Sequence, residues 1–235
     1  MSRRVLIAGN WKMNGSSADL DFFQALECRT DVDVLVCLPA TLIAKAATLT
    51  AQSEIKIGGQ DCHAAPKGAH TGDLSAAMLA DVGAQYVITG HSERRADHGE
   101  TDDGVRAKSE AAQAAGLVPV ICVGESQDDR EAGRHIEIVT AQLAGSLPAE
   151  GPFIIAYEPV WAIGTGLTAR AEDIAEMHAA IRAALPIGEA VQILYGGSVK
   201  PKNAAEILAL EDVDGALVGG ASLEAESFNA IIASA

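Results

Sequence analysis

A carboxylate at the end of an apolar strand is the most chemically informative feature of this chain of 235 residues. Residues 153–157 have the composition of a strand buried on both faces, and Glu158 follows where the chain leaves the core. An apolar loop comes next, made up of Pro159, Val160, Trp161, Ala162, Ile163, Gly164, Thr165 and Gly166. Such a loop is costly in permanent contact with water, so this stretch predicts either a lid over a catalytic base or an ordinary buried connection.

Polar residues also follow two other apolar runs. Asn10 and Lys12 come after the first run, where the Lys12 ammonium could hold a phosphate or stabilise negative charge on an oxygen. His91 precedes what looks like the first turn of a helix, whose dipole disfavours an imidazolium and favours a neutral hydrogen-bond donor. Glu93 has Lys12, Arg94 or Arg95 as a charge partner, so a supporting role in a site and a plain ion-pair network both remain open.

Two glycine pairs follow the last two apolar runs. Gly196 and Gly197 precede Ser198, and Gly219 and Gly220 precede Ala221. Bare backbone N–H groups in such turns can bind a phosphate, although each pair could also be a simple turn. A carboxylate base, a neutral donor, an ammonium and a phosphate site together are what proton abstraction beside a carbonyl requires.

Other reaction classes lack their sequence signatures. The chain has no His-Glu-x-x-His motif, and Cys62-His63 stands without matching ligands nearby, so we expect no metal site. It has neither a nucleophile elbow nor a Walker loop. Glycoside hydrolysis needs two carboxylates at strand ends, and only Glu158 is clearly placed for that role.

The elements that must position these residues alternate along the chain. Branched apolar residues are concentrated in eight short runs, at 5–9, 34–38, 55–60, 86–90, 118–123, 153–157, 192–195 and 216–219. Alanine-rich amphipathic segments such as 171–185 separate most of them. This α/β pattern predicts a single-domain (β/α)8 barrel over residues 1–235, with the polar residues on its C-terminal face. An open doubly wound sheet is the competitor, but no Gly-x-Gly-x-x-Gly opens the first helix.

The net charge, the lengths of the apolar runs and the cysteines limit the possible partners and location of the protein. The formal charge of -15, from 17 basic and 32 acidic residues, argues against nucleic acid or an anionic membrane as a partner. No run is long enough for a signal peptide or a membrane span, so we expect a soluble, cytoplasmic protein. The four cysteines show no Cys-x-x-Cys spacing and lie in or beside apolar runs, which predicts small, reduced, buried thiols at Cys28, Cys37, Cys62 and Cys122.

Five motifs together resemble the triosephosphate isomerase family. They are Gly9-Asn10-Trp11-Lys12-Met13-Asn14, Gly90-His91-Ser92-Glu93-Arg94-Arg95, residues 156–166, Tyr195-Gly196-Gly197-Ser198-Val199 and Leu217-Val218-Gly219-Gly220-Ala221, and they span the chain in the family's order. The resemblance implies a TIM barrel that interconverts dihydroxyacetone phosphate and D-glyceraldehyde 3-phosphate without a cofactor, through an enediolate, in glycolysis and gluconeogenesis.

The resemblance also implies a role for each matching residue. Glu158 matches the family's base, His91 the neutral imidazole that serves the two oxygens, and Lys12 the cation of the substrate pocket. Asn10 matches a polar contact beside that lysine, and Glu93 matches a supporting glutamate. The phosphate contacts match Gly164, Ser198, Gly219 and Gly220, and residues 159–169 match the lid.

The segment 60–73, from Gln60 to Asp73, resembles the projecting loop through which family members form homodimers. Thr71 would then reach the partner's site. The chain departs from the family at His70, where an aromatic residue is common, and at Leu167, where a lysine is common at the lid hinge. Gln192 replaces an arginine that pairs with the aspartate matching Asp214, and several helices look trimmed, among them one within 20–29.

Two other functions compete with an isomerase. Another phosphate-binding barrel enzyme would share the glycine turns, but it has no reason to combine Lys12, His91 and Glu158. A non-catalytic barrel that binds a phosphorylated metabolite predicts damage to this set of residues, and the sequence contains none.

Overall fold

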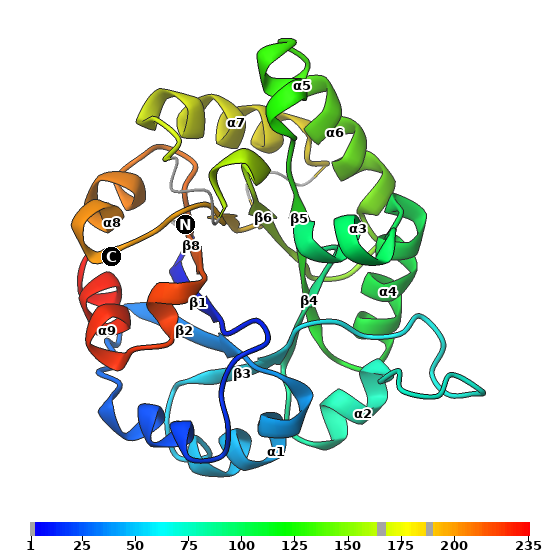
Figure 1. Cartoon of the computed structure of the whole chain (residues 1–235), viewed down its shortest axis with the longest axis vertical. Helices are drawn as coiled ribbons and strands as arrows, with labels where there is room; N and C mark the ends of the chain where they lie inside the picture. Colours follow the sequence, from blue (N-terminus) through cyan, green and yellow to red (C-terminus); the bar gives the residue numbers. More distant parts are fainter. Residues whose placement is uncertain (1–2, 164–167, 187–189) are drawn as a thin grey trace.

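The central element of the structure is a closed barrel of eight parallel strands, paired in the order of the sequence (Figure 1). The structure is a computed structural model that describes residues 3–163, 168–186 and 190–235. All eight strands predicted from the sequence are confirmed, with ends shifted by two residues at most: β1 Val5–Asn10, β2 Val32–Cys37, β3 Lys56–Gly59, β4 Tyr86–Thr89, β5 Val118–Val123, β6 Ile154–Tyr157, β7 Ile193–Tyr195 and β8 Gly215–Val218.

Helices surround the barrel on the outside (Figure 1). The α-helices are α1 Ala40–Leu49, α2 Ala76–Asp81, α3 Ser92–His98, α4 Asp102–Ala114, α5 Gln127–Glu131, α6 His135–Ser146, α7 Ala171–Ala184, α8 Pro201–Leu208 and α9 Ala225–Ala233. The helix expected within 20–29 is instead the 3-10 helix η1 Asp19–Ala25. Two further 3-10 turns, η2 Val160–Ala162 and η4 Gly220–Ser222, follow β6 and β8.

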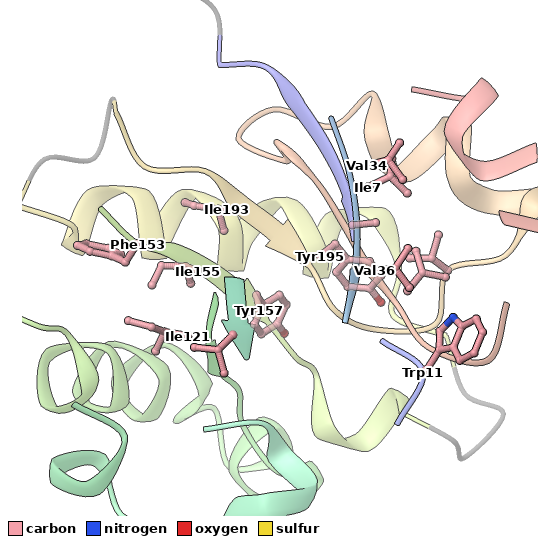
Figure 2. Close-up of a cluster of buried hydrophobic side chains, with 14 of the residues drawn as sticks. Ile7, Trp11, Val34, Val36, Ile121, Phe153, Ile155, Tyr157, Ile193 and Tyr195 are labelled. Atoms are coloured by element: carbon pink, nitrogen blue, oxygen red, sulfur yellow. The ribbon is translucent and has the colours of Figure 1, made fainter. Parts of the chain in front are cut away.

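Strand alternation divides the core into two layers. Successive side chains of a strand point to opposite faces, so alternate residues fill the barrel while the others pack against the helices. The inner layer contains Leu6, Ala8, Leu35, Cys37, Ile88, Val120, Cys122, Ile154, Ala156, Leu194 and Leu217. The outer layer includes Ile7, Val34, Ile121, Ile155 and Ile193, whose side chains Figure 2 shows beside those of Tyr157 and Tyr195.

The same alternation places polar residues in the mouth of the barrel. Leu6 and Ala8 face inward on β1, so Asn10 continues the inward row at its C-terminal end. Ile154 and Ala156 face inward on β6, and Glu158 is the next position in that row. The strand geometry therefore places Asn10 and Glu158 at the mouth of the barrel.

Asp214 anchors the opposite end of the barrel, before β8. Its carboxylate accepts bonds from Arg182 Nη2 at 2.5 Å and Arg3 Nε at 2.6 Å, and from the amide of Ile193 at 2.8 Å. Gln192 does not take part in these bonds, since its side chain donates to the carbonyl of Arg4. Two arginines from distant parts of the chain therefore supply the partner that Gln192 cannot.

The cysteines are buried as predicted with one exception. Cys37, Cys62 and Cys122 are buried free thiols, whereas the expectation for Cys28 was wrong because its side chain is exposed. Cys28 lies in the extended segment after η1, outside both layers of the core. No helix in the described part of the chain combines the length and apolar composition needed to cross a membrane.

His178 is a fully buried titratable group in α7. Its Nδ1 lies 3.0 Å from the carbonyl oxygen of Asp212, and its ring packs edge-on against Tyr157 with centroids 5.9 Å apart. Burial lowers the pKa of His178 to about 4, outweighing the carbonyl contact and the nearby carboxylates, because a charged imidazolium would lose its water.

We predict that His178 makes the protein less stable in mild acid. A pKa lower in the folded than in the unfolded chain means that the unfolded chain binds the extra proton, so stability is complete above pH 6.5 and is lost toward pH 4. The free energy of unfolding in urea should fall between pH 7 and 5 by about 2 kcal/mol more than in H178Q. Equal losses would contradict the prediction. The exposed-histidine variant H98Q is the control, and NMR titration of His178 provides a direct check.

Candidate active site

Glu158 is a buried carboxylate with two hydrogen-bond donors. Its Oε1 lies 2.8 Å from Nε2 of His91, and its Oε2 accepts the amide N–H of Ser92 at 2.9 Å. Burial raises the pKa of the Glu158 carboxyl, but His91 and the Ser92 amide outweigh burial, so the net shift is downward. The carboxylate is therefore held ionised within the barrel mouth.

Two glycines make room for Glu158. A Cβ on Gly196 would lie 2.9 Å from Cγ of Glu158, and a Cβ on Gly124 would lie 1.8 Å from its carbonyl oxygen. Both distances are too short for a side chain, so the ends of β5 and β7 can approach Glu158 only as glycine.

His91 is oriented by the start of α3. It is the N-cap residue of that helix, and its Nδ1 accepts the amide N–H of Glu93 at 3.2 Å. A nitrogen that accepts an N–H carries no proton, so Nε2 holds the proton in the neutral ring and donates it toward Glu158. Burial lowers the pKa of His91 while the Glu158 carboxylate raises it more, so this pKa falls again when Glu158 moves away or takes up a proton.

Lys12 reaches the same site from an unusual backbone conformation. Its φ is 53°, in the left-handed region that a non-glycine residue adopts at an energetic cost. Asn10 Oδ1 accepts the Lys12 amide at 3.0 Å, and Gln60 Nε2 donates to the Lys12 carbonyl at 2.9 Å, which holds the turn. The ammonium forms an ion pair with Glu93. Of the three candidate partners of Glu93 in the sequence, Lys12 is therefore the one that it contacts.

The other two candidate partners of Glu93 form separate ion pairs. Arg94 pairs with Asp61 and Glu100, and Arg95 pairs with Asp102. Glu93 is 48% exposed in spite of its contact with Lys12.

One cavity of about 650 Å³ contains most of the predicted site. Its walls include Lys12, His91 and Glu158 together with the glycine turns after β7 and β8. The two sets are close neighbours, since a Cβ on Gly219 would lie 3.6 Å from Cε of Lys12. The remaining wall residues are Asn10, Ile163, Gly196, Gly197, Ser198, Val199, Lys200, Pro201, Leu217, Gly219, Gly220, Ala221 and Ser227. Glu93 lies behind Lys12, Thr71 is exposed on the segment before α2, and Gly164 and Thr165 lie outside the described residues.

A second buried carboxylate supports the start of the apolar loop. Glu125 follows β5 and accepts Trp161 Nε1 at 2.9 Å and the hydroxyl of Tyr157 at 3.1 Å. Burial raises the pKa of Glu125, although these bonds oppose the shift. The expectation that only Glu158 is clearly placed at a strand end was wrong, because Glu125 follows β5 in the same way, after Val123 and Gly124. Glu125 does not line the cavity.

His63 has neighbours that the sequence did not indicate. His70 and Asp73 bring possible ligand atoms within 4.8 Å of it, and the two imidazole centroids are 4.0 Å apart. The amide of Ala65 donates to Nδ1 of His63 at 2.9 Å, so the proton of the neutral ring lies on Nε2. Neither nitrogen of His63 then offers a free lone pair, and the three side chains do not form a prearranged metal site.

Comparison with known proteins decides the family. The sequence model for triosephosphate isomerase matches residues 5–235. This chain belongs to the triosephosphate isomerase family. The family's members from Ruegeria sp. (strain TM1040) and Afipia carboxidovorans are 60% and 58% identical to it, over 98% and 97% of this chain and 97% and 96% of theirs. A crystal structure of triosephosphate isomerase from Bartonella henselae matches with a TM-score of 0.92 at 45% identity, covering 98% of each chain.

Membership of the triosephosphate isomerase family establishes the reaction. The protein interconverts dihydroxyacetone phosphate and D-glyceraldehyde 3-phosphate in glycolysis. The residues that the sequence analysis missed are those with indirect roles: Ser92 through its amide, Gln60 through its contact with Lys12, and Glu125 beneath the loop.

We predict that the Trp161 bond to Glu125 stabilises the fold. W161F should lower the free energy of unfolding by about 1–2 kcal/mol, because a buried acceptor loses a donor. A double-mutant cycle with E125Q, measured by urea denaturation, should give a coupling energy of about 1 kcal/mol. Additive effects of the two substitutions would show that the bond contributes nothing.

Proposed function

We propose that Glu158 is the base that moves the proton between the two carbons of the triose phosphate. The observation that carries this proposal is that its buried carboxylate, His91 and Lys12 line the same cavity as the two glycine turns. A substrate bound in this cavity presents its carbonyl and hydroxyl carbons to these three side chains and its phosphate to the glycine turns. Glu158 takes a proton from one carbon and returns it to the other.

We infer that His91 serves the substrate oxygens as a neutral donor. Its Nε2–H points at Glu158, and a carbonyl oxygen placed there would accept the same proton. The Glu93 amide and the helix N-terminus favour the neutral ring at Nδ1, against the Glu93 carboxylate, whose Oε2 lies 3.6 Å from the same nitrogen. Pairing a glutamate base with a neutral histidine is the known pattern of this family.

Negative charge on the enediolate oxygen needs a nearby cation. We propose that the Lys12 ammonium supplies it, held by Glu93 and by the turn that Asn10 stabilises. Backbone amides near Ser198, Gly219 and Gly220 would hold the phosphate, together with Gly164. Closure of residues 159–169 would keep water from the enediolate, which otherwise loses its phosphate.

We also propose a homodimer formed through residues 60–73, with the whole chain folded as one domain. Figure 1 shows the segment between β3 and α2 projecting beyond the ring of helices. Three exposed apolar side chains lie near this segment. Leu74 and Met78 follow it in the sequence, and Met13, which is 96% exposed, is next to Lys12, whose carbonyl Gln60 contacts. Burying them against a second copy, with Thr71 near Asn10 and Glu93 of that copy, removes this surface from water. We infer a cytoplasmic location from the reduced thiols and the reaction itself.

Shortening the Glu158 side chain tests its role. We expect E158D to lower kcat by about 100-fold or more, because the carboxylate retracts from the reacting carbon, while KM changes by less than about threefold. Steady-state kinetics in both directions measure this effect. E100D is the matched control, since it shortens a carboxylate that is only 8% exposed and lies outside the cavity, and it should retain most of kcat. Undiminished turnover in E158D would exclude Glu158 as the base.

Charge placed on the projecting segment tests the dimer. T71R should convert the dimer to a monomer at micromolar concentration in sedimentation-velocity experiments, because an arginine would be forced into a closed interface. A149R adds the same charge at an exposed position in the turn before β6 and should leave the dimer intact. A wild-type protein that sediments as a monomer at all concentrations would refute the interface.

A further inference from the structure

The cavity has little positive charge for a phosphorylated substrate. Among the described residues that line it, only Lys12 and Lys200 carry a fixed positive charge. Lys12 is paired with Glu93, and the Glu158 carboxylate lies in the same cavity. The chain as a whole has a formal charge of -15. Without Lys200, a phosphate dianion would approach a site whose nearby acidic groups outnumber the basic ones.

Lys200 lines this cavity close to the glycine turn after β7. It follows Ser198 and Val199 and is the N-cap residue of α8. Asn203 fixes the main chain here, because its Oδ1 accepts the Lys200 amide at 2.7 Å and its Nδ2 donates to the Ser198 carbonyl at 3.0 Å. The buried side chain of Val199 anchors the segment from below. The base of the lysine is therefore held in place while its stem remains free to move.

The Lys200 side chain has no competing charge partner in the described part of the chain. None of the carboxylates described there lies within ion-pair distance of its ammonium, in contrast to Lys12, Lys108 and most of the arginines. The side chain is exposed at the cavity edge, so binding a phosphate requires neither the loss of an ion pair nor the desolvation of a buried charge.

We propose that Lys200 is a substrate-binding residue that attracts and contacts the phosphate of the triose phosphate. The proposal rests on the phosphate position given above, between Ser198 and Gly220. Backbone amides there supply hydrogen bonds but no net charge, and Lys200 adds the unpaired cation beside them. Its effect is on capture of the dianion rather than on proton transfer, because the lysine follows Ser198 at the proposed phosphate position, whereas proton transfer is assigned to Glu158 and His91.

Lys202 provides a matched control. It is an exposed lysine two residues further along α8 that does not line the cavity, so its removal changes the net charge equally. K200Q should raise KM and lower kcat/KM for D-glyceraldehyde 3-phosphate by about threefold to tenfold at low ionic strength, with kcat unchanged. The effect should shrink at high ionic strength, since salt screens exposed charges, and K200R should restore most of it. K202Q should change kcat/KM by less than about twofold.

Two further measurements separate a phosphate contact from a structural effect. The inhibition constant of inorganic phosphate should rise in K200Q by the same factor as KM. Turnover of unphosphorylated D-glyceraldehyde should be unchanged, because that substrate has no dianion to attract. Equal effects of K200Q and K202Q, an unchanged phosphate inhibition constant, or an equal loss with D-glyceraldehyde would each overturn the proposal.

A glycine variant keeps this proposal distinct from the proposed phosphate position. A Cβ on Gly220 would meet no atom within 4 Å, so G220A should fold normally while placing a methyl group where the phosphate is expected. If G220A weakens phosphate inhibition and K200Q does not, the phosphate position holds and the role of Lys200 falls. If neither variant affects phosphate inhibition, the proposed position of the phosphate is itself wrong.

Discussion

The site depends on the buried carboxylate of Glu158 and the two N–H groups that it accepts. A charge out of water costs several kcal/mol unless donors replace the lost hydration. Here His91 Nε2 and the Ser92 amide are those donors, and both come from the first residues of α3. The same arrangement that stabilises the buried carboxylate also places the histidine N–H at the cavity wall.

The barrel fixes this interaction through strand geometry rather than through the loops. Asn10 and Glu158 continue the inward rows of β1 and β6, so their positions follow from the packing of the strands beneath them. Lys12 lies in a turn and not on a strand, and its left-handed backbone conformation is strained. Hydrogen bonds with Asn10 and Gln60 hold the backbone in this conformation. The cation therefore occupies a defined place although it belongs to a turn.

Much of this could be predicted from the sequence because the signals were local. Buried strands read as continuous apolar runs, and residues that follow parallel strands meet on one face, which was enough to bring Lys12, His91 and Glu158 together. The partners of Asp214 could not be found in this way, because Arg3 and Arg182 lie far from it in the sequence and only the closed barrel brings them close. The Ser92 amide carries no side-chain signal, and Cys28 was judged by its apolar neighbours although its segment lies outside the core. Glu125 was detectable by the same rule as Glu158, and its neighbour Gly124 marked the close approach of the two strand ends.

The start of the apolar loop is attached at two points to the strand ends that surround the site. Pro159 directly follows Glu158 after β6, and Trp161 donates to the buried Glu125. Ala162 is fully buried and Trp161 packs against the core, while Ile163 lines the cavity, so the described start of the loop joins the core to the site.

The proposed chemistry requires a neutral His91 with its proton on Nε2, held there by the Glu93 amide. Nitrogen-15 NMR of histidine-labelled protein at pH 8.5 tests it most directly, with the signals of His91 assigned by their loss in H91Q. We expect an unprotonated Nδ1 and a protonated Nε2. Protonation of both nitrogens, or a proton on Nδ1 alone, would contradict it.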